Sequence, residues 1–295
     1  PLRYGMSLPA GKPRAHIVYV EGLSEFAEKT FELARDFNRE SCGFYVFDRQ
    51  GQGLSGRFLK DPGKEHSEGF NHDADDLAQF IRTEVPHDAP VIVLAHSAGG
   101  LITMLAAHDN PDLAEGVVMT APLLGIQNPM ARNIERFWAT MPEPRCLSEH
   151  YIPFTDPKVW RRSEKRDDPA VDEFSSDPER SLVHDYWRER NPGLRTIGPT
   201  WGWVRESCKA IVKTRSAGYL ESIQTPLAIF TGGDDGTVYN KHTFNALARL
   251  PHATHTHFEK GKHELLMETD DIRQPIIDAT LGLADAAWDR GFTPH

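Results

Sequence analysis

The stretch Val91-Ile92-Val93-Leu94-Ala95-His96-Ser97-Ala98-Gly99-Gly100 decides the fold. Its first four residues are an apolar run, and a second apolar run follows at 101–107. This pattern predicts a buried strand that turns sharply into a helix at Ser97. The residues around Ser97 are all small, as such a tight turn requires.

A serine at a strand-to-helix turn is a candidate nucleophile. In a nucleophile elbow the strained turn lifts the hydroxyl above the sheet and places the next amide, here that of Ala98, at a helix N-terminus. The alternative is that Ser97 only caps the helix, and Ala95 stands where the motif usually has glycine. A hydrolase of this kind also needs an acid and then a histidine, in that order along the chain.

The acid is expected just past a late buried strand. The apolar run 226–231 is followed by the adjacent carboxylates Asp234 and Asp235. We favour Asp235, because Val238 resembles the apolar anchor that follows the acid in α/β-hydrolases. Asp234 is then expected to hold the turn through Asx hydrogen bonds. The other interpretation is that both carboxylates only shape a turn.

The base is expected in a loop after the last strand. His263 follows the predicted strand at 254–258 and precedes a helix, which is the position of the base in such folds. Because the chain contains 14 histidines, this position rather than the number of histidines supports the assignment. His96 lies on the elbow itself and is expected to pack beside the site.

The composition excludes several classes of protein. The 295 residues carry a formal net charge of -10, which argues against a nucleic-acid partner. No apolar run approaches the length of a membrane span. The three cysteines have no metal-binding or redox spacing, which favours a reducing, cytoplasmic compartment. An export signal removed before Pro1 is the alternative.

Short apolar runs alternate with helical patterns along most of the chain. This order predicts an α/β fold, with a mostly parallel sheet flanked by helices on both faces. The expected strands are 16–20, 44–48, 91–95, 116–120, 227–231 and 254–258, and the expected helices are 26–40, 71–83, 98–108, 241–250 and 272–287.

The alternation stops between residues 125 and 218. We expect this segment to be a helical cap over the carboxyl ends of the strands, inserted into a core formed by 1–124 and 219–295. Five of the six tryptophans lie in it. These aromatic residues either line an apolar pocket or form the core of the cap. The candidate pocket residues are His96, Leu123, Phe137, Trp138, Trp201 and Trp203.

No metal or organic cofactor is expected. His255 and His257 fall on one face of a predicted strand, and His252 is near, but no carboxylate of clear geometry accompanies them. The glycines of Gly51-Gln52-Gly53 lack the third glycine and the helix of a phosphate-binding loop, so they indicate a tight turn.

Several motifs together resemble the family of serine hydrolases that includes bacterial lysophospholipase L2 and monoacylglycerol lipase. The resemblance covers nearly the whole chain. The matching segments are 21–29, 48–55, 120–125, 176–180, 199–203 and 261–268.

This resemblance implies an α/β-hydrolase fold and a catalytic triad of Ser97, Asp235 and His263. It also implies an oxyanion hole formed by the backbone amides of Leu23 and Ala98. The implied activity is hydrolysis of a small lipid-like ester, a lysophospholipid or a monoacylglycerol, through an acyl-enzyme. The expected partner is therefore a small-molecule ester.

Two positions depart from the family pattern. Glu21 stands where a histidine is usual, and Gln50 stands where an arginine is usual, with Arg49 just before it. These departures leave open a homologue that binds a ligand without turnover. Within enzymes, a peptidase, a lactonase or a polyester hydrolase of the same fold is the alternative.

Overall fold

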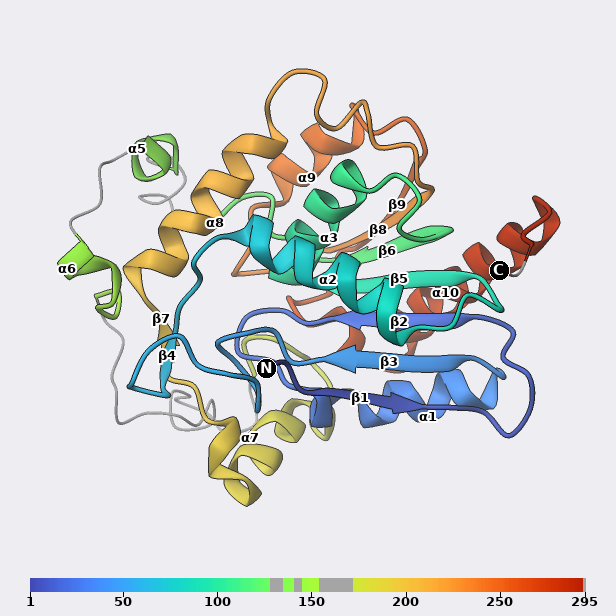
Figure 1. Ribbon diagram of the computed structural model, residues 1–295, viewed down its shortest axis with the longest axis horizontal. Coiled ribbons are helices and arrows are strands. Elements are labelled where there is room, and N and C mark those ends of the chain that lie inside the picture. The colour runs from blue at the N-terminus through green and yellow to red at the C-terminus, as the bar shows by residue number, and fades with distance from the viewer. Residues whose placement is uncertain (128–134, 141–144, 154–171, 294–295) are drawn as a thin grey trace.

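A seven-stranded sheet forms the centre of the molecule in the computed structural model (Figure 1), which describes residues 1–127, 135–140, 145–153 and 172–293. The strand order is β1-β3-β2-β5-β6-β8-β9. The first strand is antiparallel to its neighbour and the other pairs are parallel. The bounds are β1 Tyr4–Ser7, β2 His16–Val20, β3 Gly43–Phe47, β5 Val91–His96, β6 Gly116–Thr120, β8 Leu227–Gly232 and β9 Ala253–Phe258.

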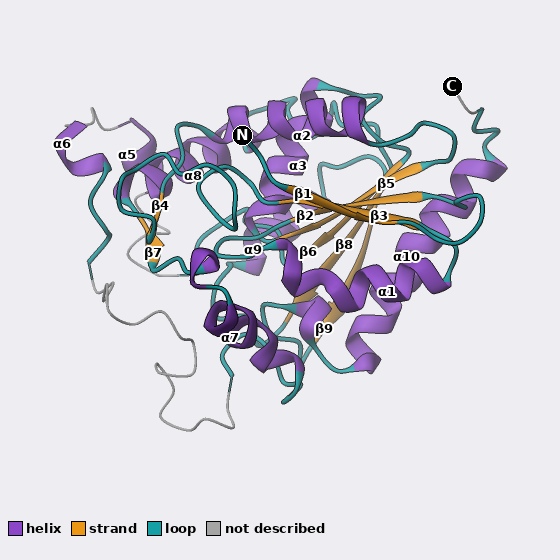
Figure 2. Ribbon diagram, turned by 60° about the horizontal axis from the view of Figure 1, so that its bottom comes forward, coloured by secondary structure: helices purple, strands orange, loops and turns teal. Residues whose placement is uncertain are grey.

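Helices cover both faces of the sheet (Figure 2). Helices α1 (Phe31–Arg39) and α10 (Asp270–Asp289) bury their apolar residues in one cluster with one face of the strands. Helices α2 (Phe70–Glu84), α3 (Ala98–Asp109) and α9 (Asn240–Leu247) contribute to the cluster on the other face. The α/β architecture expected from the alternating pattern is therefore confirmed.

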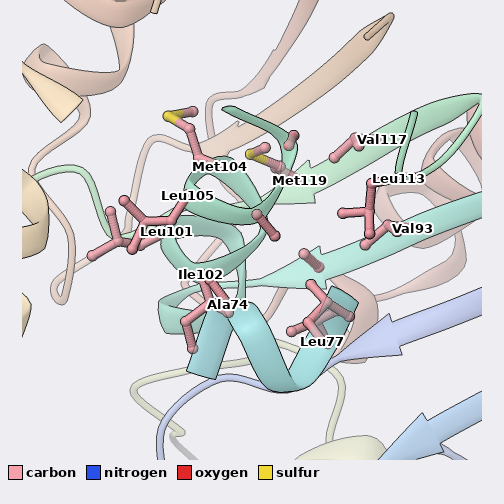
Figure 3. Packing of buried hydrophobic residues seen from close by; sticks show 14 of the residues in the cluster. Ala74, Leu77, Val93, Leu101, Ile102, Met104, Leu105, Leu113, Val117 and Met119 are labelled. Carbon is pink, nitrogen blue, oxygen red and sulfur yellow. The ribbon is translucent and has the colours of Figure 1, made fainter. Parts of the chain in front are cut away.

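Strand β5 shows why the sequence forms a buried parallel strand. Val91, Val93 and Ala95 face one apolar cluster, and Ile92 and Leu94 face the other. Because both faces are covered, the strand is a continuous apolar run rather than an alternating one. Figure 3 shows α2 and α3 packed over the first of these clusters.

The element boundaries differ from the expected ones in a few places. The helix expected at 26–40 is divided into a 3-10 turn, η1 (Ala27–Thr30), and α1. Strand β1 was not expected from the sequence, because its four residues Tyr-Gly-Met-Ser are only partly buried at the sheet edge and carry no apolar run. The remaining strands and helices lie within a few residues of their expected ranges.

The described part of segment 125–218 is mostly helical. It contains α5 (Glu135–Thr140), α6 (Arg145–Ser148), α7 (Arg180–Arg190), η3 (Pro192–Leu194) and α8 (Trp201–Thr214). It also contains an unexpected two-residue strand, β7 (Gly198–Pro199), paired with β4 (Lys64–Glu65) of the preceding part of the chain. Figure 1 shows α5, α6 and β7 beyond the carboxyl ends of the parallel strands. The exact limits of the cap stay a prediction.

None of the helices in the described ranges combines the length and the apolar character needed to cross a membrane.

Gly99 allows the first turn of α3 to pack against the end of β2. A Cβ atom placed there would lie 2.2 Å from the carbonyl oxygen of Val20 and 2.7 Å from that of Glu21. Both neighbours are backbone atoms, which cannot rotate away. This close contact sets the position of the helix start relative to the sheet.

We expect Gly99→Ala to lower the free energy of unfolding by about 1–3 kcal/mol, because overpacking forces the helix away from β2. Urea denaturation measures this loss. Gly282→Ala in α10 is the matched control, since a Cβ there meets nothing within 4 Å. In that helix interior alanine should stabilise the protein by about 0.5–1 kcal/mol. Equal effects of the two substitutions would contradict the packing argument.

Candidate active site

Ser97 adopts a strained backbone conformation between β5 and α3. Its φ of 51° and ψ of -116° lie in a region that L residues rarely adopt, at a cost of about 1–3 kcal/mol. The neighbouring strand holds this turn in place. The Ser97 amide donates to the carbonyl of Thr120 at 3.0 Å, and the amide of Leu123 donates to the carbonyl of Ser97 at 2.9 Å. The turn therefore has the strand-to-helix geometry that the sequence predicts for a nucleophile elbow.

The three candidate catalytic side chains meet at the carboxyl edge of the sheet. The Ser97 hydroxyl lies 2.9 Å from Nε2 of His263. On the other side of the ring, Nδ1 of His263 lies 2.8 Å from Oδ2 of Asp235. All three residues are buried. Because they follow β5, β8 and β9, the parallel topology brings residues that are far apart in sequence into one relay.

Asp235 is fixed by its own loop as well as by His263. Its Oδ1 accepts hydrogen bonds from the amides of Thr237 at 2.7 Å and Val238 at 3.0 Å. Burial alone raises the pKa of Asp235, but the His263 charge and these hydrogen bonds outweigh it, so the pKa lies below its ordinary value. Asp235 is therefore ionised and can orient the imidazole.

The role expected for Asp234 needs a correction. The Asx hydrogen bonds of this turn come from Asp235, whereas the Asp234 side chain is exposed. The backbone amide of Asp234 instead donates to the carbonyl of Gly261 at 3.0 Å. The reason is geometric: one carboxylate oxygen of Asp235 faces His263, and the other remains free to cap its own loop.

Leu23 and Ala98, whose amides are the candidate oxyanion donors, both lie in segments next to Ser97. Ala98 begins α3, and Leu23 follows Gly22 in the loop after β2, which is the strand next to β5. A Cβ on Gly22 would lie 3.2 Å from Cβ of Ser97, so this loop runs directly beside the elbow. Neither amide donates a hydrogen bond to another residue in the described part of the chain. Both donors are thus available to a ligand oxygen.

One of the two departures from the family pattern, Glu21, belongs to a hydrogen-bonded support of this loop, together with Arg49 and Gln52. Arg49 donates to the carbonyl of Gly22 at 3.1 Å, and Nε2 of Gln52 donates to the same carbonyl at 3.0 Å. Gln52 also lies 3.0 Å from Oε2 of Glu21. Arg49 is buried, whereas Gln50 is partly exposed. The loop that carries Leu23 is therefore braced from one side even though a histidine is absent.

His96 packs against the catalytic histidine. The two ring centroids are 4.8 Å apart, and Nδ1 of His96 is 3.1 Å from the hydroxyl of Thr120. Burial lowers the pKa of His96 to about 4, and a charge on His263 acts in the same direction. His96 is therefore neutral near pH 7.

An apolar cavity of about 470 Å³ opens above Ser97 and His263. Of the expected pocket residues, His96, Leu123 and Trp203 line it. Phe137 is exposed, and Trp201 is partly buried at the start of α8 without lining the cavity. The side chain of Trp138 lies outside the described residues. Sequence reasoning missed other lining residues, including Leu23, Ile126, Ile152, Phe174, Ile197 and Val204.

The histidines of β9 point toward a hydroxyl group of the neighbouring strand. Nε2 of His255 and Nδ1 of His257 both lie 2.8 Å from the hydroxyl of Thr231. Within the described ranges, the one group of three potential ligands that lie close together is Glu25, His96 and Glu264. These two carboxylates already share a cation of the chain, the ammonium group of Lys29, at 2.7 Å from each.

Glu21 provides a test of the electrostatics of this buried loop. Burial raises the pKa of Glu21 well above its ordinary value, and Asp48 acts in the same direction. The folded chain therefore keeps this carboxyl protonated, whereas the unfolded chain ionises it above a pH of about 4.3. Since the unfolded state then binds fewer protons, this group makes the protein less stable as the pH rises toward the folded pKa.

We expect Glu21→Gln to remove the loss of stability that the ionisation of Glu21 in the unfolded state causes as the pH rises. Relative to the parent protein, the melting temperature of the variant should increase progressively from pH 5 to pH 8, because the amide keeps the hydrogen bonding of the neutral acid without ionising. Thermal unfolding at pH 5, 6.5 and 8 measures the difference. A difference that is the same at all three pH values would show that Glu21 does not change its protonation on unfolding.

Comparison with known proteins places this geometry in a family. The family described as serine aminopeptidase, S33, matches residues 11–270. Lysophospholipase L2 of Escherichia coli is 29% identical over 277 residues, which cover 89% of this chain and 78% of that protein.

Solved structures agree with the fold. A soluble variant of monoglyceride lipase from Saccharomyces cerevisiae aligns with a TM-score of 0.73 and 16% identity, covering 96% of this chain and 91% of that one. A thermostable carboxyl esterase from Bacillus coagulans aligns with a TM-score of 0.74 and 18% identity, covering 99% and 94%. The chain belongs to the serine aminopeptidase S33 family and has the α/β-hydrolase fold.

Proposed function

We propose that this protein, a carboxylic ester hydrolase, cleaves small lipid-like esters through an acyl-enzyme formed on Ser97. The observation that carries the proposal is the relay from Ser97 through His263 to Asp235, with hydrogen-bond distances of 2.9 and 2.8 Å. This relay lies at the base of an apolar cavity. The arrangement supplies a nucleophile, a base and an orienting carboxylate in one buried cluster.

The first half of the reaction forms the acyl-enzyme. Nε2 of His263 accepts the proton of the Ser97 hydroxyl while the oxygen attacks the ester carbonyl. Asp235 accepts a hydrogen bond from Nδ1 of His263, which fixes the tautomer and stabilises the imidazolium. The developing oxyanion is bound by the amides of Leu23 and Ala98, each contributing about 3 kcal/mol to transition-state stabilisation. The first half ends when His263 donates its proton to the leaving alcohol as the ester C–O bond breaks.

The second half releases the acid. In this half, His263 accepts a proton from a water molecule that attacks the acyl-enzyme carbonyl. The tetrahedral intermediate collapses as His263 returns the proton to the Ser97 oxygen. The acyl group leaves as a carboxylic acid, and the enzyme is restored.

The cavity supports a lipid-like substrate. Apolar side chains such as Leu123, Ile126 and Trp203 line it, and its volume of about 470 Å³ is in the range of small-molecule sites. The names lysophospholipase and monoglyceride lipase among the relatives point to the same substrate class. We therefore propose a lysophospholipid or a monoacylglycerol as the substrate.

We expect a fluorophosphonate probe to label Ser97, because the relay activates its hydroxyl, and Ser97→Ala to abolish both labelling and hydrolysis of short p-nitrophenyl esters. Mass spectrometry locates the label. Specificity is then measured as kcat/KM on lysophospholipids, monoacylglycerols, lactones, polyesters and peptides. Fastest turnover of a peptide would contradict the proposed substrate class. A folded parent protein that is neither labelled nor active would indicate a ligand-binding homologue.

The adjacent carboxylates allow a matched test of the acid. Asp235→Asn should lower kcat by about 10⁴-fold, because the amide cannot stabilise the imidazolium or hold its tautomer. Asp234→Asn should leave kcat within about threefold, since its side chain is exposed and the relay does not use it. Steady-state kinetics on one p-nitrophenyl ester compares the two. The reverse order of effects would assign the acid to Asp234.

A further inference from the structure

A buried ammonium group lies between two carboxylates beside the relay. Lys29 belongs to η1 and is buried, as are Glu25 and Glu264. Its Nζ lies 2.7 Å from Oε1 of Glu25 and 2.7 Å from Oε1 of Glu264. Glu25 and Lys29 are neighbours in sequence, whereas Glu264 is far from both of them. The ammonium group therefore joins two segments that are distant in the sequence.

Glu25 connects this ammonium group to the oxyanion loop. Its Oε2 accepts a hydrogen bond from the amide of Gly22 at 2.6 Å and one from the hydroxyl of Tyr19 at 3.1 Å. Gly22 directly precedes Leu23, the candidate oxyanion donor. Burial raises the pKa of Glu25, but the charge of Lys29 outweighs it and holds the pKa at about 2. Glu25 is therefore charged, and a change in its position moves the Gly22–Leu23 peptide.

Glu264 connects the same ammonium group to the base. It directly follows His263, and its amide donates to the carbonyl of Phe174 at 2.8 Å. Lys29 therefore links the loop that carries the oxyanion donor to the loop that carries the imidazole. The reaction rate depends on the distance between these two loops, because a misplacement of about 1 Å can lower the rate about 100-fold.

Stability alone is a poor reason for such a cluster. Transferring charges into the interior costs several kcal/mol per ion, and apolar residues of similar volume often replace a buried ion pair without loss of stability. A cluster located between two catalytic loops has a second use, because ion pairs at 2.7 Å fix direction and distance more narrowly than apolar contacts do.

We propose that Lys29 is a positioning residue. Through Glu25 and Glu264 it fixes the position of the Leu23 amide relative to the His263 imidazole. This inference rests on the proposed esterase function. Lys29 itself does not contact the relay atoms. Its contribution should therefore appear in the rate of the chemical step rather than in substrate binding.

The test compares three variants on one p-nitrophenyl ester. Lys29→Met should lower kcat by about 10- to 100-fold while KM stays within about twofold. Lys29→Arg, which can still pair with both carboxylates, should recover kcat to within about fivefold of the parent. The control is Asp36→Asn in α1, which breaks the ion pair to the buried Arg273 of α10 at 2.7 Å but leaves the hydrogen bond from Arg273 to the carbonyl of Leu266. It should lower the melting temperature but leave kcat within about twofold.

Three results would overturn the inference: an unchanged kcat in folded Lys29→Met, a rise in KM alone, or an equal loss of kcat in Asp36→Asn. If Lys29→Met does not fold, Glu264→Gln keeps the side-chain volume and breaks the link on the base side. Its kcat should also fall at constant KM, and an unchanged kcat would again overturn the inference. An inactive parent protein that the fluorophosphonate probe does not label would instead reject the proposed function.

Discussion

The strained turn at Ser97 is the constraint on which the site depends. A serine with a φ of 51° persists because the surrounding structure holds it, through hydrogen bonds to β6 and the loop after it and through the close packing of Gly99 on β2. Ser24 and Ala121 also have positive φ values and lie in the adjoining loops. The sheet core thus supports several unfavourable backbone conformations at one edge, where loops must turn sharply around a reactive group.

The same edge explains how distant residues form one relay. Parallel strands end at a common side of the sheet, so the loops after β5, β8 and β9 converge there whatever their separation in sequence. Substrate selection is a separate matter, because α8 and other residues after position 125 form much of the cavity wall. The candidate catalytic residues therefore follow strands of the sheet, whereas residues after position 125 contribute much of the wall around them.

Local patterns were sufficient for six of the seven strands of the sheet and for choosing the residues of the relay. The apolar run of β5 and the small residues after it predict the elbow, and Val238 distinguishes Asp235 from Asp234. The buried supports of the loops were not predictable in this way. In the sequence, Lys29 has no feature that distinguishes it from other charged residues. Only the fold brings it next to Glu264, which lies more than 200 positions further along the chain. Phe137 was expected to line the pocket but is exposed, because the sequence of a short helix does not show which face of the helix turns toward the cavity.

The distribution of charge around the relay matches the charge separation of the proposed reaction. The carboxylates of Glu25 and Asp235, whose pKa values both lie below their ordinary values, are located near the paired imidazoles of His96 and His263. Negative charge at this place favours the imidazolium that forms during attack. On the side of the oxyanion, burial keeps Glu21 protonated, so no additional negative charge opposes the Leu23 amide. At position 21, a buried carboxyl that accepts a hydrogen bond from Gln52 therefore supports this loop in place of the usual histidine.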